Sequence, residues 1–310
     1  MGRYPLIAAF FFTTVLAFSD LSVGLMPAEN SIPLVVAARD GLFAAEGVRV
    51  ALVPFSGQME RETALQTGAI DGTVSDLVNA IQAWSRGFGA RVTSVTEGSF
   101  SLLAAPRSWL RSLAYWSDGP GGRVRTGLLE SSLVYYLTER MLSAGGADAA
   151  GIELVPIVQP PARLEMLLAG RIDAACLPEP LASYAVSRGA IRLARSDDLR
   201  TTPGVLLFTK TALASRGSEV SAFYRAYDRA VRALAKDPEA YRDAIIDGCG
   251  FPPSVKETMK IPSFQAARLP SVADVDDVAR WMRSKGLLDV VPAYGDIVAA
   301  GFVGSDARVP

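Results

Sequence analysis

The chain has 310 residues, half of them hydrophobic and a fifth charged, which indicates a soluble globular protein of one or two domains. Acidic and basic residues nearly cancel, with a formal net charge of -1, so no basic excess exists to attract nucleic acid. The sequence contains no histidine, which excludes Ser-His and Cys-His nucleophile pairs and most zinc and non-haem iron sites. Its two cysteines, Cys176 and Cys249, are too few for a metal cluster or a disulfide framework, although they could form one bridge. We therefore expect no cofactor and no metal.

The N-terminus carries a short apolar segment. Arg3 precedes an apolar run at residues 6–18, which is too short to span a bilayer and has the length of a signal-peptide core. Ala17 offers a cleavage point, and no cysteine follows the run to carry a lipid anchor. The alternative is a buried first helix or strand. We predict a signal peptide at residues 1–19 and export to the periplasm.

An internal repeat is the most informative feature of the mature chain. Residues 50–71 (VALVPFSGQMERETALQTGAID) and 152–173 (IELVPIVQPPARLEMLLAGRID) align without a gap. Both copies contain an apolar run ending in Pro, a central Arg (Arg61 or Arg163), and a Gly-x-Ile-Asp ending. A looser match precedes each copy, Gly-Leu at 24–25 and at 127–128. The chain therefore contains two similar units.

Each copy predicts a strand, a helix and a second strand. The Pro ends the first strand because it lacks an N–H, and Gly68 or Gly170 ends the helix because glycine accepts left-handed backbone. Strands alternating with helices form parallel sheets, so two α/β lobes are expected. For Asp71 and Asp173, which follow these glycines, we favour a structural role: bonding a loop to backbone N–H groups.

The rest of the chain fits a two-lobed molecule. A strand at 101–106 is expected to run into the second lobe, and a strand at 205–209 to return. Amphipathic helices are predicted at 218–236 and 274–286. The predicted organisation is lobe one at 20–104, lobe two at 105–203, and the second part of lobe one at 204–310. The two crossings, near 104–106 and 203–205, would form a hinge.

Three stretches carry a family resemblance: IPLVVAARDGLFAAEGVRVALVPF, ETALQTGAIDGTVSDLVNA and LEMLLAGRIDAACLPEPLAS. They resemble the nitrate/taurine/thiamine-precursor group of ABC-importer substrate-binding proteins, over almost all of the mature chain. The resemblance implies a type II periplasmic binding fold, two α/β lobes joined by a two-strand hinge, with a ligand between them. It implies a monomer that delivers a solute to a membrane permease with an ATPase subunit, without nucleic acid and with the membrane reached only through the permease.

Ligands of parallel α/β sheets bind beyond the carboxyl ends of the strands. The candidate ligand-binding residues at those ends are Glu29, Asn30, Ser31, Phe55, Ser56, Asp76, Glu130, Ser131, Ser132, Gln159 and Glu179. The loop tips carry four carboxylates and no Arg or Lys, which favours a cation or a hydrogen-bond-donating, nitrogen-containing solute over an oxyanion. Asp76 could instead cap the following helix, and Glu29 and Glu130 could point to solvent. Arg163 could reach the cleft, but its match to Arg61 favours a structural pairing.

Two other functions use the same scaffold. One is an enzyme, either like a menaquinone-pathway dehydratase or related to pyrimidine-precursor synthesis; the known pyrimidine route depends on histidine and iron, and this chain has no histidine. The other is a ligand-sensing domain, for which no output module is evident. No G-x-x-x-x-G-K-[ST] segment occurs, so the importer's ATPase must be another chain. The preferred interpretation is a solute-binding protein without catalytic residues.

Overall fold

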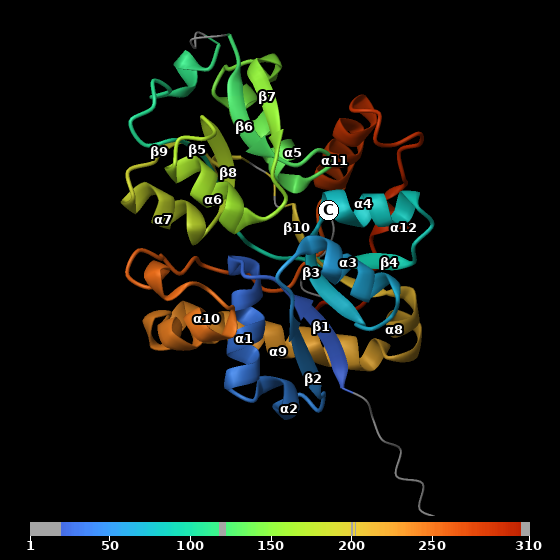
Figure 1. Cartoon of the computed structure of the whole chain (residues 1–310). Helices are drawn as coiled ribbons and strands as arrows, with labels where there is room; N and C mark the ends of the chain where they lie inside the picture. Colours follow the sequence, from blue (N-terminus) through green and yellow to red (C-terminus); the bar gives the residue numbers. More distant parts are fainter. Residues whose placement is uncertain (1–19, 118–121, 200, 202, 305–310) are drawn as a thin grey trace, which may run out of the picture.

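The computed structural model describes residues 20–117, 122–199, 201 and 203–304, so the expected signal peptide lies outside the described residues. Within these residues the chain forms two five-stranded sheets (Figure 1). The first, in the order β2-β1-β3-β10-β4, contains β1 (Leu21–Leu25), β2 (Val50–Pro54), β3 (Gly72–Asp76), β4 (Ala90–Val95) and β10 (Gly204–Thr209). The second, in the order β7-β6-β8-β5-β9, contains β5 (Phe100–Ala104), β6 (Val124–Leu128), β7 (Ile152–Pro156), β8 (Ala174–Pro178) and β9 (Ile191–Arg195). We call each sheet with its covering helices a lobe.

The two sheets have the same topology. In the first lobe β1 pairs in parallel with β2 and β3, and β10 runs antiparallel to β3 and β4. In the second lobe β6 pairs in parallel with β7 and β8, and β5 runs antiparallel to β8 and β9. The predicted pair of similar α/β lobes is confirmed by this arrangement.

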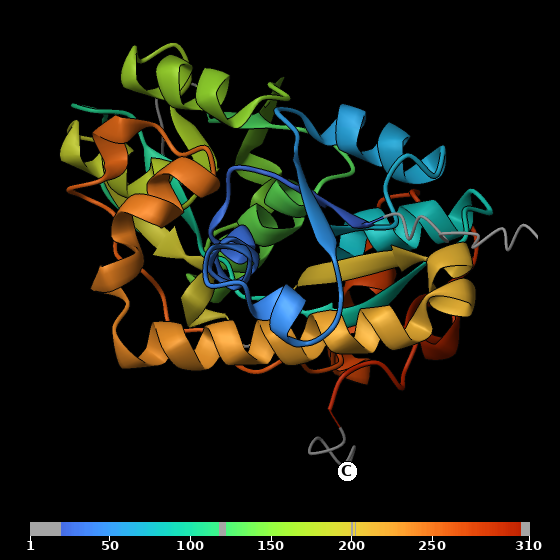
Figure 2. The same cartoon turned by 90° about the horizontal axis from the view of Figure 1, so that it is seen from below.

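Helices cover both sheets. The helices before the second lobe are α1 (Ile32–Arg39), α2 (Leu42–Ala45), α3 (Gln58–Gln66) and α4 (Leu77–Ser85), and those within it are α5 (Leu133–Ala144), α6 (Pro160–Leu168) and α7 (Leu181–Ser187). The C-terminal helices are α8 (Lys210–Ser215), α9 (Gly217–Lys236), α10 (Arg242–Gly248), α11 (Val272–Ser284) and α12 (Tyr294–Ile297). Figure 2 shows α9 running along the first lobe, where it contacts α1 and α2. The apolar faces predicted for α9 and α11 are buried, including Phe223, Tyr227, Val278 and Trp281. No helix among the described residues is long and apolar enough to cross a membrane.

The repeat forms equivalent units, β2-α3-β3 and β7-α6-β8. Gly68 and Gly170 follow the two helices with φ of 74° and 66°, the left-handed conformation that the sequence predicted. Asp71 accepts a hydrogen bond from the Ser22 N–H (2.8 Å), and Asp173 accepts one from the Arg125 N–H (3.0 Å). The structural role favoured for both aspartates is therefore confirmed.

The chain crosses between the lobes earlier than predicted. The strand predicted at 101–106 was expected to lead from lobe one into the crossover, but it is observed as β5 (Phe100–Ala104) and pairs with β8 and β9 of the second sheet. The first crossing is therefore residues 96–99, not 104–106, and the second is the segment from 196 to 203. Sequence alone did not reveal this because an apolar strand fits either sheet equally well.

The C-terminal helix α11 forms a third connection between the lobes, and in Figure 1 it lies beside α4 and α5. Asp277 accepts hydrogen bonds from Tyr136 (2.7 Å) and from two nitrogens of Arg140 (3.1 and 2.8 Å). The Trp281 indole donates to Glu139 (2.7 Å). Because α5 belongs to the second lobe and α4 to the first, α11 holds the two together along one side.

Candidate functional site

Two neighbouring compartments of the space between the lobes share lining residues. The larger one, of about 490 Å³, is lined by both crossing segments and by charged residues that include Glu29, Glu97, Glu179, Arg192, Arg195 and Lys260. The smaller one, of about 130 Å³, is lined by residues that include Arg61, Ser75, Asp76, Ser132, Pro160 and Arg163. Asn30, Phe100 and Leu133 line both compartments. They are therefore parts of one interlobe cleft, at the carboxyl ends of the strands where ligands of parallel sheets bind.

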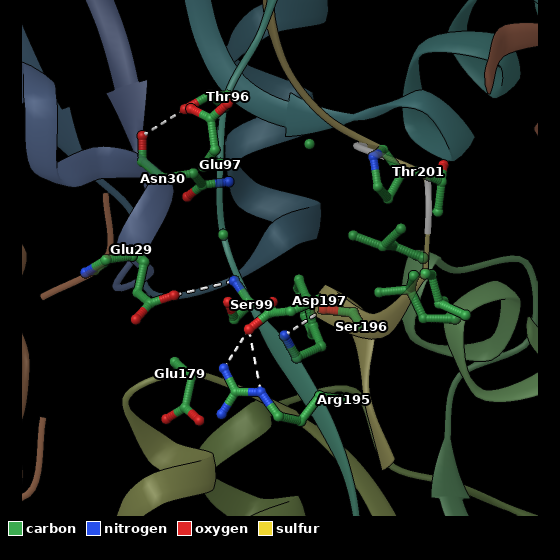
Figure 3. A pocket seen from close by; sticks show the side chains of 18 of the residues that line it. Glu29, Asn30, Thr96, Glu97, Ser99, Glu179, Arg195, Ser196, Asp197 and Thr201 are labelled. Atoms are coloured by element: carbon green, nitrogen blue, oxygen red, sulfur yellow. Dashed lines mark hydrogen bonds and ion pairs between the residues drawn. The ribbon is translucent and has the colours of Figure 1, made fainter. Parts of the chain in front are cut away.

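Glu29 is the buried acid of the larger compartment. It lies in the turn between β1 and α1 and is 4 % exposed. Its carboxyl accepts a hydrogen bond from the Ser99 N–H on the first crossing segment, at 3.0 Å (Figure 3). Burial raises its pKa from 4.5 to about 8, the nearby Glu179 and Asp197 add to this rise, and Arg195 offsets it. At neutral pH this raised pKa leaves the carboxyl mostly protonated.

The other acidic side chains of the larger compartment have cationic partners. Glu179 pairs with Arg192 at 3.1 Å and also accepts the Ser183 N–H. Asp197 pairs with Arg195; burial opposes its ionisation, but hydrogen bonds from Arg195 and Ser99 lower its pKa. Glu97 pairs with Arg268 at 2.6 Å.

Glu29 differs because no Lys or Arg among the described residues lies within ion-pair distance of it. Its carboxyl is therefore the one acidic group of the larger compartment that a ligand could satisfy without displacing a partner.

Several polar atoms of the larger compartment are buried without a hydrogen-bond partner in the described part of the chain. They are Asn30 Oδ1, Arg192 Nε and Thr201 Oγ1. Such atoms are costly unless a ligand or water satisfies them. Lys260, which is exposed at the edge, has no hydrogen-bond or ion-pair partner within the same residues. The compartment therefore offers both donors and acceptors to a small polar solute.

The structure brings only part of the predicted site together. The predicted residues that line a compartment are Glu29, Asn30, Asp76, Ser132 and Glu179. Ser31 is buried and donates to the Met26 carbonyl, and Phe55 packs on the core near Gly24. The predicted residues that line neither compartment are Ser31, Phe55, Ser56, Glu130, Ser131 and Gln159. Ser56, Glu130 and Gln159 are exposed, so their loop tips turn to solvent.

Two of the predicted residues have local structural roles. Asp76 caps α4, because its carboxyl accepts the Asn79 N–H (2.9 Å) and the Asn79 side-chain amide (2.7 Å). Burial raises its pKa to about 6. Ser132 caps α5 and accepts the Tyr135 N–H at 3.4 Å. The capping alternative considered for Asp76 is confirmed.

The loop tips were expected to give the cleft an acidic character with unpaired carboxylates, but other segments bring basic side chains to it, and Glu179 is paired with Arg192. Arg192 and Arg195 on β9, Lys260 on the loop after α10, and Arg61 and Arg163 on the repeat helices all line the cleft. The prediction missed Arg192 and Arg195 because no strand was expected at 191–195, and it missed Lys260 because that residue comes from a loop distant in sequence. The short apolar segment IRLAR with its two arginines, just before the chain returns to lobe one, was the available signal.

The two cysteines are free and buried rather than bridged. Burial raises the pKa of the Cys176 thiol to about 12 and also raises that of Cys249. Neither thiol lines the larger or the smaller compartment. No group of three or more His, Cys, Asp or Glu side chains among the described residues could hold a metal ion.

The family model NMT1/THI5 like matches residues 28–241, more than two thirds of the chain. The chain belongs to this family. A search of curated proteins found no match. Among solved structures, the alkanesulfonate-binding protein SsuA from Xanthomonas axonopodis pv. citri, bound to MOPS, superposes with a TM-score of 0.76 at 20 % identity, covering 91 % of this chain and 98 % of that chain.

Two further structures show how widely the fold is used. The aliphatic sulphonate binding protein SsuA from Escherichia coli has a TM-score of 0.76 at 18 % identity, covering 90 % and 92 % of the two chains. The desulfurization enzyme DSZB has a TM-score of 0.69 at 16 % identity, covering 92 % and 97 %. At these identities the likeness establishes the fold of the NMT1/THI5-like chain, that of a type II periplasmic binding protein, and does not identify its ligand.

Proposed function

We propose that this NMT1/THI5-like protein is an extracytoplasmic solute-binding protein of an ABC importer. It captures a small nitrogen-containing organic solute between its lobes and delivers it to a permease with an ATPase subunit. We further propose that an N-terminal signal peptide exports it to the periplasm and that it acts as a monomer. The lobes are residues 20–99 with 204–310, and 100–203, which moves the first predicted boundary to the observed crossing.

The buried carboxyl of Glu29 carries this proposal. It faces a cavity of about 490 Å³ between two lobes, and the neighbouring carboxylates already have cationic partners. A protonated carboxyl both donates and accepts a hydrogen bond, which suits a heterocycle that has a ring nitrogen beside an N–H. An ionised one suits an ammonium or amidinium group. In either state Glu29 favours nitrogen on the solute.

The crossing segments explain how capture would occur. Ser99, which bonds to Glu29, lies on the first crossing, and Ser196 and Thr201, which also line the cavity, lie on the second. A solute held there contacts the hinge itself, so its binding energy favours one relative orientation of the lobes. Because α11 contacts α5 and holds the lobes together on one side, this relative motion of the lobes is expected on the opposite side of the molecule.

The test is a thermal-shift screen of residues 20–310 against amines, amidines and nitrogen heterocycles. A ligand at a hundred times its Kd adds about 2.7 kcal/mol to stability. Glu29→Gln should weaken a ligand found in this way by about 10- to 100-fold, because a charge-assisted or paired hydrogen bond is lost. Glu165→Gln, on the exposed face of α6, is the matched control and should leave the affinity unchanged.

Two results would contradict the proposal. Mass spectrometry of the screened mixtures would detect whether a compound is consumed. Consumption would favour an enzyme on this scaffold. A ligand whose affinity is the same in wild-type protein and in Glu29→Gln would remove Glu29 from the site.

A further inference from the structure

The lobes also meet on the side of the cleft away from α11. There α7 of the second lobe contacts the turn Pro253–Val255, which follows α10 in the first lobe (Figure 1). This α7 carries Tyr184, a half-buried side chain that packs against the apolar cores of both lobes. Because α11 holds the lobes together along the other side, opening of the cleft would separate α7 from this turn.

The equivalent position of the first lobe shows how the two sides differ. Tyr184 follows Gln82 by 102 residues, the offset of the repeat, and Gln82 lies on α4 at the α11 side. The Gln82 side chain also reaches the other lobe, where its Nε2 donates to the Ser131 carbonyl at 2.7 Å. That hydrogen bond joins lobes that α11 already connects. Tyr184 instead joins them by apolar packing, on a side where none of the described helices spans both lobes.

The first-lobe segment that receives Tyr184 is fixed to α10. Met259 belongs to the buried core of the first lobe against which Tyr184 packs. Arg242 on α10 donates to the carbonyls of Lys256 (2.8 Å) and Met259 (2.9 Å). Glu239 holds the Arg242 guanidinium through two hydrogen bonds of 2.7 Å. A bidentate pair of this kind fixes the direction of the guanidinium, so the segment offers Tyr184 a firm surface.

The contact borders the larger compartment. Ser183, which precedes Tyr184 on α7, and Lys260, which follows Met259, line that compartment from opposite lobes. Glu179 also lines it and accepts the Ser183 N–H at 2.9 Å. Separation of α7 from the first lobe would therefore move these polar groups apart and open the compartment to solvent.

We propose that Tyr184 is a clasp that keeps the cleft closed on the side away from α11. An aromatic ring that packs between two lobes is exposed to water when they separate, and the loss of buried apolar area opposes opening. The Tyr184 hydroxyl has no hydrogen-bond partner among the described residues, so packing of the ring supplies the effect. The clasp sets the ratio of open to closed molecules. Its consequence for the release of a solute rests on the proposed function.

The experiment measures the distance between the lobes by electron–electron double resonance, without any solute. Spin labels are attached at Arg188→Cys on the second lobe and at Asp247→Cys on the first, both exposed positions. The protein without these two substitutions should take up no label, because Cys176 and Cys249 are buried. Tyr184→Ala should raise the ratio of long to short distances about 10-fold, because a half-buried aromatic contact between the lobes is lost. Tyr184→Phe keeps the ring and should give the wild-type distances.

Two further variants separate the clasp from general stability. Tyr294→Ala removes a half-buried tyrosine whose hydroxyl donates within the first lobe, to the Pro270 carbonyl (2.7 Å), and should leave the distances unchanged. Arg242→Met should raise the ratio of long to short distances, but should add little to the effect of Tyr184→Ala, because both changes act on the same contact.

Unchanged distances in Tyr184→Ala, or equal opening in Tyr184→Phe, would overturn the proposal. Because the measurement uses no solute, the clasp can be established even if the solute screen fails, and the screen can succeed if the clasp is refuted. For a solute found in that screen, Tyr184→Ala should also increase the rate of release about 10-fold.

Discussion

The two copies of the repeat differ in one informative respect. Both keep the Pro that ends a strand, the left-handed glycine after the helix, and the aspartate that binds the backbone of the neighbouring strand. Both keep a buried arginine, and among the described residues Arg61 has a carboxylate, that of Glu62, within ion-pair distance, whereas Arg163 has none. The shared residues maintain the scaffold, and the difference lies in how the two arginine charges are compensated.

The loops after β1 and β6 differ in a second way. In the first lobe this loop buries Glu29 against the crossing segment, whereas in the second lobe Ser132 caps α5 in the corresponding turn. The buried acid Glu29 is therefore supplied by one lobe, and Arg163, which has no ion-pair partner among the described residues, by the other. Closure of the lobes would bring unlike groups toward a solute from opposite sides.

The largest expected effect concerns Glu29 and the pH dependence of stability. Its pKa is raised to about 8 by burial, so the folded protein holds this proton more tightly than the unfolded chain. Stability should fall as the pH rises from 4.5 to 8. Glu29→Gln should remove this component and be about 2–4 kcal/mol more stable than wild type at pH 8.5, with little difference at pH 4.5. Urea denaturation at both pH values measures this, and parallel pH profiles would show that Glu29 is ionised in the folded protein.

The next effect compares the two arginines directly. Arg61→Met leaves the partly buried Glu62 without its cation and should cost about 2–3 kcal/mol of unfolding free energy. Arg163→Met leaves no carboxylate unpaired and should lie within about 1 kcal/mol of wild type. Urea denaturation of both variants tests the difference. Equal losses would mean that the two copies are electrically alike and that Arg163 has a partner of its own.

The sequence allowed the fold to be predicted because its signals were local and occurred twice. Each copy of the repeat has a Pro at the end of an apolar run, a spacing of apolar residues typical of a helix, and a glycine at the helix end. These signals are enough to predict a strand, a helix and a second strand. The candidate site was predicted less well. Glu29 and Glu179 were named, but Arg192 and Arg195 lie on β9, which was not predicted, and Lys260 lies on a distant loop. No local pattern shows which sheet a strand such as β5 joins. Whether Arg163 has a counter-ion depends on its packing, although Leu164 opposite Glu62 was visible in the alignment.

The smallest effect tests the part of the repeat that should be equivalent. Gly68 and Gly170 both adopt positive φ, and an added Cβ would meet nothing within 4 Å at either position. Alanine there is disfavoured by its own backbone alone, so Gly68→Ala and Gly170→Ala should each cost about 1 kcal/mol. Urea midpoints of the two variants should agree within about 0.5 kcal/mol. A larger loss of unfolding free energy in one variant would mean that the helix end of that copy makes contacts the other copy lacks. The two copies would then be equivalent in their strands but not in their helix ends.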